Sequence, residues 1–172
     1  MRALKLTVEK KMENTLVFIH GLESTAQGTK GKFFRHNFSQ MIIENYTGDF
    51  TARMLKLSNI LKGKTNLRIV GSSYGGLMAV QYAIKNETHV NKLILLAPAL
   101  NLPEFTPNLD KIIQLPVIIY HGIEDNVVDP LAVKNIASKV FRQLDHYFVD
   151  DDHSLHKIFP LIEWKNLLQS DM

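Results

Sequence analysis

The chain has 172 residues, of which 45% are hydrophobic and 22% are charged, and its formal net charge is +3. This length and composition are typical of one globular domain, here residues 1–172, with a single buried core. The charge excess is too small, and the basic residues too scattered, to predict a nucleic-acid-binding surface. The absence of cysteine excludes disulfides, thiolate catalysis and cysteine-ligated zinc.

The first residues, MRALKLTVEKKMEN, carry lysines where the apolar centre of a signal peptide would lie, so no export signal is expected. No stretch approaches the roughly 20 apolar residues that span a bilayer. A soluble cytoplasmic protein with no membrane partner is therefore expected. Leu4, Leu6 and Val8 alternate with other residues, which suggests an added edge strand.

Short apolar runs recur along the chain, with helical periodicity between them. Runs without polar alternation are typical of strands buried on both faces of a parallel sheet. The runs predicted as strands are TLVFIH (15–20), the weaker FTARML (50–55), NLRIVG (66–71), KLILLAPA (92–99), PVIIYHG (116–122) and HYFVD (146–150). Helices are predicted over 33–46, 74–87, 129–141 and 154–169, the third with Asp129 as N-cap and Pro130 at its first position.

This alternation predicts an α/β fold, a three-layer sandwich whose mostly parallel central sheet has about six or seven strands and carries helices on both faces. Ligands of such sheets bind at the carboxyl ends of the strands. The residues that follow each predicted strand are therefore the candidates for function. The least regular stretches are 21–32 and 99–115, and the second is a candidate to fold over the site.

The stretch IVGSSYGG (69–76) places two serines between a predicted strand and a predicted helix. A sharp strand-to-helix turn with the pattern G-x-S-x-G exposes its central serine as a nucleophile. The frame Gly71-x-Ser73-x-Gly75 selects Ser73 over Ser72. The alternative is a plain glycine-rich connection or a phosphate-binding turn.

A nucleophilic serine needs a base, and the base needs an orienting acid, which in this fold follow the serine in the order acid, then histidine. Asp125 comes just after the strand PVIIY and is the predicted acid, with its neighbour Glu124 as the fallback. Asp129 is better explained as a helix cap. The Asp-rich segment at 150–152 is most simply a solvated turn and cap region.

Among the histidines, His153 follows the last predicted strand and precedes the last helix, where the base should lie. His146, at or before the start of that strand, is expected at the opposite end of the sheet. His156 is expected inside the last helix, on a surface. His20, at the end of the first strand, is expected to bond its own loop.

The backbone N–H groups of Leu22 and Tyr74 are the predicted oxyanion hole, because they lie at the first strand's end and at the start of the helix after Ser73. A metal site could be imagined on the spacing of His153 and His156, or on His20 with His121. No recognised ligand motif accompanies them, so neither a metal nor a cofactor is expected.

The ordered set HGLES, GSSYGG, HGIEDNVV and DDH resembles the α/β-hydrolase superfamily, in particular small single-domain bacterial serine esterases of the YqiA-like kind. The resemblance covers roughly residues 14–170. It implies Ser73 as nucleophile, Asp125 as acid and His153 as base, with Leu22 and Tyr74 as oxyanion-hole amides. Superfamily members commonly insert a helical cap after the strand that here ends near Pro98. Residues 99–115 are too few for one, so a minimal fold with an open site is expected.

The predicted function is a serine hydrolase that cleaves small-molecule carboxylic esters of short to medium acyl chains through an acyl-enzyme. An acyl thioesterase with the same residues is the first alternative. A non-catalytic binding protein on the same fold is the second, since fold alone does not imply activity. The cavity walls are expected from 22–32, 99–112 and 126–131, and the sequence does not indicate an oligomeric state.

Overall fold

The computed structural model describes residues 14–169, and its centre is one six-stranded, fully parallel sheet in the order β2-β1-β3-β4-β5-β6. The strands are β1 (Thr15–Ile19), β2 (Ile42–Ile43), β3 (Leu67–Ser72), β4 (Val90–Leu96), β5 (Ile113–Gly122) and β6 (Phe141–Val149). The predicted fold class and strand number are confirmed. The suggested edge strand at Leu4, Leu6 and Val8 lies outside the described residues.

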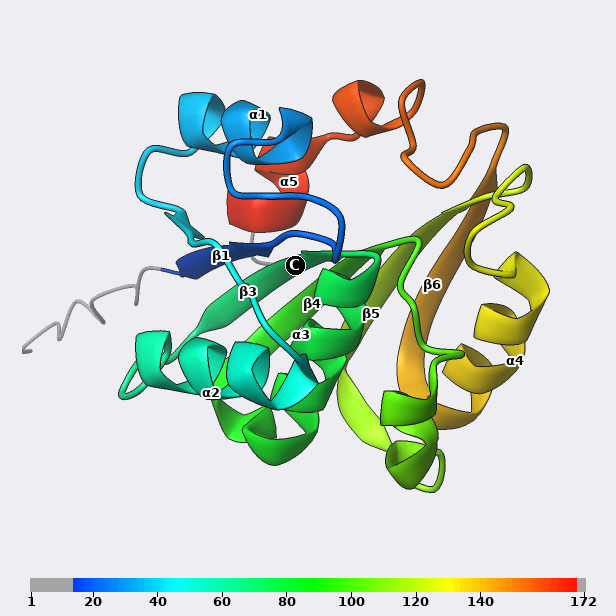
Figure 1. Cartoon of the computed structure of the whole chain (residues 1–172), viewed down its shortest axis with the longest axis horizontal. Coiled ribbons are helices and arrows are strands. Elements are labelled where there is room, and N and C mark those ends of the chain that lie inside the picture. The colour runs from blue at the N-terminus through cyan, green and yellow to red at the C-terminus, as the bar shows by residue number, and fades with distance from the viewer. Residues whose placement is uncertain (1–13, 170–172) are drawn as a thin grey trace, which may run out of the picture.

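Helices cover both faces of the sheet and give the three predicted layers (Figure 1). They are α1 (Thr29–Asn37), α2 (Phe50–Ile60), α3 (Tyr74–Lys85), α4 (Pro130–Val140) and α5 (Trp164–Gln169), with short 3-10 turns η1 (Glu87–His89), η2 (Pro103–Asn108) and η3 (Phe159–Leu161). α1 and α5 lie on one face, and α2, α3 and α4 lie on the other (Figure 1). None of the helices in residues 14–169 is long and apolar enough to span a bilayer.

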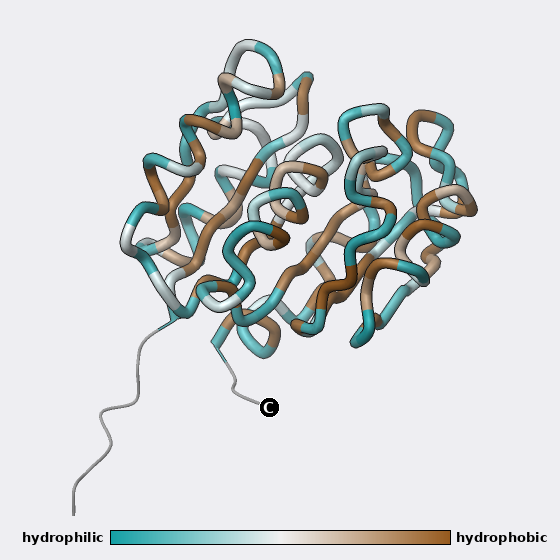
Figure 2. Tube along the Cα trace, turned by 90° about the horizontal axis from the view of Figure 1, so that it is seen from below, coloured by the Kyte–Doolittle hydropathy of each residue, from teal (hydrophilic) through white to brown (hydrophobic). Residues whose placement is uncertain are grey.

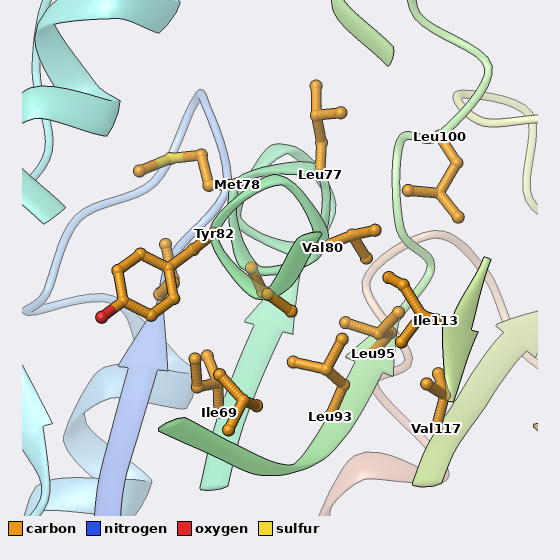
Figure 3. Packing of buried hydrophobic residues seen from close by; sticks show 14 of the residues in the cluster. Ile69, Leu77, Met78, Val80, Tyr82, Leu93, Leu95, Leu100, Ile113 and Val117 are labelled. Carbon is orange, nitrogen blue, oxygen red and sulfur yellow. The ribbon is translucent and has the colours of Figure 1, made fainter. Parts of the chain in front are cut away.

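The core consists of two apolar clusters, one on each face of the sheet. Successive strand residues point to opposite faces, so Ile69 packs under α3 while its neighbour Val70 packs under α1 and α5. Figure 3 shows Val80 on the side of α3 nearer to Leu93 and Leu95 of the sheet, while Leu77 points away from the strands. The strands run as hydrophobic stretches through the fold (Figure 2). Burial on both faces explains why the predicted strands lack polar alternation.

The prediction of a strand at 50–55 is wrong, because these residues begin α2. The Asp49 side chain accepts a hydrogen bond from the Ala52 N–H at 2.8 Å, which caps the helix. Arg53 and Leu57, four residues apart, are both buried on one side of α2. A six-residue window is too short to separate this helical spacing from a strand.

Two predicted helices are also revised, while those at 74–87 and 129–141 are confirmed as α3 and α4. The predicted helix 33–46 ends at Asn37, because Ile42 and Ile43 form an edge strand beside β1. The predicted helix 154–169 is broken into η3 and α5. Leu155 has a φ of +56°, and Pro160 cannot continue a helix through its own position.

His146 lies in the middle of β6, opposite Ile119, rather than at the far end of the sheet as expected, because β6 starts at Phe141. Its ring stacks on Phe148 at 4.5 Å between centroids, and neither ring nitrogen has a hydrogen-bond partner among the described residues. Burial, with His121 and Lys134 adding to it, lowers the pKa of His146 to about 4.

We therefore expect the free energy of unfolding to fall as the pH drops from 6.5 towards 4. Between these pH values His146 is protonated in the unfolded chain but largely neutral in the folded chain. This difference lowers the free energy of unfolding by up to about 3 kcal/mol. Urea unfolding at pH 7 and pH 4.5 should show a smaller loss for His146→Leu than for the unaltered protein. The exposed His36 is the matched control, and an equal effect of His36→Leu would contradict this account.

Candidate functional site

Ser73 stands at the sharp turn between β3 and α3, with φ +54° and ψ −117°. This backbone conformation is sparsely populated by residues other than glycine, so the fold must hold it in place. A Cβ at position 71 would lie 2.5 Å from the Gly75 carbonyl oxygen, so only glycine lets strand and helix approach this closely. Ser72 is the last residue of β3 and lies outside the apex.

The structure brings Ser73, His153 and Asp125 into one hydrogen-bonded chain. His153 Nε2 lies 3.0 Å from Ser73 Oγ, and His153 Nδ1 lies 2.7 Å from Asp125 Oδ2. An ionised carboxylate only accepts hydrogen bonds, so Nδ1 carries the proton and Nε2 turns its lone pair to the Ser73 hydroxyl. The histidine is thus in the tautomer that can remove a proton from Ser73.

The Asp125 carboxylate is completely buried and accepts four hydrogen bonds. Oδ1 accepts from the N–H groups of Val127 and Val128 at 2.8 and 2.9 Å, and Oδ2 accepts from His153 and His121. Burial alone would raise the pKa of Asp125. The hydrogen bonds from Val128, His153 and Val127 outweigh burial, so the pKa is lowered and the group is ionised.

His121 is a member of this site that the sequence reasoning did not assign. It is fully buried, and its Nε2 lies 3.0 Å from Asp125 Oδ2 and 3.1 Å from the Val128 carbonyl oxygen. Both partners are acceptors, so Nε2 carries the proton, and burial lowers the pKa of His121. The signal for it was its place directly after the strand run PVIIY, four residues before Asp125.

The segment that carries His153 is more ordered than the solvated turn expected at Asp150–Asp152. Asp151 is only 1% exposed, and its Oδ2 accepts hydrogen bonds from the N–H groups of Lys157 and Ile158. Its carbonyl oxygen accepts from Glu124 N–H at 3.1 Å, which ties this loop to the loop of Asp125. The solvated-turn interpretation is therefore wrong for Asp151.

The two residues whose amides are expected to stabilise an oxyanion belong to different segments near Ser73. Tyr74 is the first residue of α3, and Leu22 follows Gly21, whose added Cβ would lie 3.3 Å from Ser73 Cβ. His20 holds this loop, since its Nδ1 donates to the Gly21 carbonyl at 2.7 Å and its Nε2 accepts from Tyr46 N–H at 2.9 Å. The expectation that His20 bonds its own loop is confirmed.

Ser73 and His153 open into a cavity of 730 Å³. This volume lies within the range of small-molecule sites. The expected walls at 22–32, 99–112 and 126–131 contribute Leu22, Leu102 and Val127 among others. The segment 153–160 forms a further wall that the sequence reasoning did not include.

The other candidates from the sequence lie away from this chain of hydrogen bonds. Glu124 is exposed, and Asp129 caps α4 by accepting from Leu131 N–H at 2.9 Å, as expected. His156 lies in a turn rather than a helix and is exposed, with Nδ1 3.0 Å from Asp152 Oδ2. Within residues 14–169, no group of three or more His, Cys, Asp or Glu side chains could hold a metal ion.

A sequence model of the alpha/beta hydrolase fold matches residues 22–115, which is more than half of the chain. The chain belongs to the α/β hydrolase fold family. The match contains the strand–Ser73–helix turn and the loop of Leu22. A search of curated proteins finds no match.

Solved structures of other α/β hydrolases share the fold at low sequence identity. Alpha/beta hydrolase domain-containing protein 10 from mouse is 20% identical with a TM-score of 0.67, over 83% of each chain. Est1E from Butyrivibrio proteoclasticus, with ferulic acid bound, is 15% identical with a TM-score of 0.71, over 86% of this chain and 84% of that one. The esterase Pf2001 from Pyrococcus furiosus is also 15% identical, with a TM-score of 0.69 over 91% and 78%.

In this α/β hydrolase, residues 99–115 pack against the Ser73 turn. The Ala99 N–H donates to the Ser73 carbonyl at 3.1 Å, and Phe105 is fully buried. The Tyr74 hydroxyl donates to Glu104 Oε1 at 3.1 Å, which ties α3 to η2. The segment therefore supports the turn and borders the cavity through Asn101 and Leu102.

Proposed function

We propose that this α/β hydrolase is a serine hydrolase that cleaves carboxylic esters of short to medium acyl chains. The observation that carries the proposal is the chain of hydrogen bonds from Ser73 through His153 to Asp125, at 3.0 and 2.7 Å. This arrangement gives a serine hydroxyl a base, and gives the base an acid that orients it.

In the proposed reaction, Ser73 Oγ attacks the ester carbonyl carbon while His153 Nε2 takes the hydroxyl proton. The N–H groups of Leu22 and Tyr74 stabilise the negative oxygen of the tetrahedral intermediate. His153 then gives its proton to the departing alcohol, which leaves an acyl group on Ser73. A water molecule, deprotonated by His153, attacks this acyl group and releases the carboxylic acid.

The cavity supports a small ester as substrate. Its volume is 730 Å³, and residues 99–115 contribute only one edge of it rather than a cap. Est1E, which shares the fold, binds ferulic acid, and a carboxylic acid is what ester hydrolysis releases. The same attack cleaves a thioester, so acyl thioesters belong beside p-nitrophenyl esters in the substrate panel.

Labelling with a fluorophosphonate probe tests the nucleophile, because such probes react covalently with an activated serine. We expect Ser73→Ala to abolish labelling and to lower kcat on p-nitrophenyl butyrate by at least about a thousandfold. The adjacent Ser72 is the matched control, and Ser72→Ala should still be labelled.

Persistent labelling of Ser73→Ala would remove Ser73 from the mechanism. An unaltered protein that neither reacts with the probe nor hydrolyses any ester or thioester of the panel would instead indicate a binding protein on this fold.

A further inference from the structure

Lys30 brings a positive charge into the cavity that contains Ser73. It lies in the first turn of α1, is half-buried, and is the one lysine or arginine among residues 14–169 that lines this cavity. Its Nζ donates to the Ser154 carbonyl at 2.6 Å and lies 5.5 Å from the centroid of the Phe159 ring. The charge is thus held against an apolar wall.

The Lys30 ammonium has N–H groups that are available to bind a ligand. One hydrogen bond uses one of its three N–H groups. Burial lowers the pKa of Lys30, and the nearby carboxylates of Asp152 and Asp151 offset part of this lowering. Both carboxylates accept hydrogen bonds from groups of their own loop. No carboxylate among the described residues forms an ion pair with Lys30.

A partly buried ammonium with free N–H groups and no carboxylate bonded to it is stabilised further when an anion binds beside it. We propose that Lys30 binds a carboxylate of the substrate, so that the preferred ester carries a free carboxylate besides the bond that Ser73 attacks. This inference rests on the proposed function. One ammonium balances one negative charge, which favours a carboxylate over a dianionic phosphate. Glu23, the other charged residue of the cavity lining apart from histidine, is exposed.

Matched ester pairs test this inference at pH 7.5. For the acyl side, p-nitrophenyl butyrate is compared with mono-p-nitrophenyl glutarate, and for the alcohol side, phenyl butyrate with 4-carboxyphenyl butyrate. We expect kcat/KM to be at least about tenfold higher for the carboxylate member of one pair. In Lys30→Met this ratio should fall to near one. Lys32→Met, at an exposed position on the same helix, should keep it.

Two outcomes would overturn the inference. The unaltered protein could prefer the neutral member of both pairs, a result that needs no variant. Alternatively, Lys30→Met, folded by circular dichroism, could slow both members of each pair equally, which would assign Lys30 to holding Ser154 and the adjacent His153. Failure of the proposed function is distinct from either, because the neutral esters would then not be hydrolysed and Ser73 would not be labelled.

Discussion

Replacing Asp125 with asparagine is expected to lower kcat/KM on p-nitrophenyl butyrate by about a thousandfold to ten-thousandfold, with little change in KM. The change is nearly isosteric, so the loss would come from chemistry rather than packing. It follows from the four hydrogen bonds that the carboxylate accepts.

Every partner of the Asp125 carboxylate is a donor, and an asparagine offers only one acceptor oxygen. With its oxygen facing the N–H groups of Val127 and Val128, its NH₂ group faces His153. That NH₂ can donate only to an unprotonated Nδ1, which moves the histidine proton to Nε2. Nε2 then has no lone pair for the Ser73 hydroxyl, so the base is lost while the fold around it remains.

Steady-state kinetics and probe labelling of Asp125→Asn measure this effect. The exposed neighbour Glu124 provides the matched control, and Glu124→Gln should retain activity within about twofold. A large loss in Glu124→Gln together with near-normal activity in Asp125→Asn would transfer the role of the acid to Glu124.

The order of the motifs makes the main residues of the candidate site predictable. In a parallel sheet, the residues after each strand collect at one edge, so the positions of Ser73, Asp125 and His153 in the sequence predict that they are neighbours. The structure brings these three side chains within hydrogen-bonding distance. The glycine frame around Ser73 likewise predicts which of the two serines stands at the apex.

The contacts around those residues depend on loop paths that no local pattern encodes. In the sequence, Asp151 is one of three adjacent aspartates typical of a solvated turn, but its loop turns it inward to bind the N–H groups of Lys157 and Ile158. Lys30 meets the Ser154 carbonyl across 124 positions of sequence. The strand predicted at 50–55 is in fact the start of α2. One of the buried positions of α2 is Arg53, so the apolar residues alone do not show the helical periodicity.

The second large effect is expected at Gly75, where alanine should destabilise the protein by more than about 3 kcal/mol or prevent folding. An added Cβ would clash with the Ile19 carbonyl oxygen and would lie 2.6 Å from that of His20. Ile19 is the last residue of β1 and His20 follows it, and β1 lies inside the sheet between β2 and β3, so it cannot withdraw without breaking its pairing. Because β1 also leads into the loop of Leu22, any relaxation would shift the amide that we propose as an oxyanion donor.

Urea unfolding of Gly75→Ala, with Gly63→Ala as control, separates this clash from the general cost of losing a glycine. Gly63 has a φ of +74° and nothing within 4 Å of an added Cβ, so its replacement should cost only about 1–2 kcal/mol of backbone strain. If Gly75→Ala is no less stable than Gly63→Ala, then β1 and α3 are not in the close contact described. If Gly75→Ala folds but has a low kcat, the loss would be explained by displacement of the loop at Leu22, because Ser73, His153 and Asp125 are all unchanged in this variant.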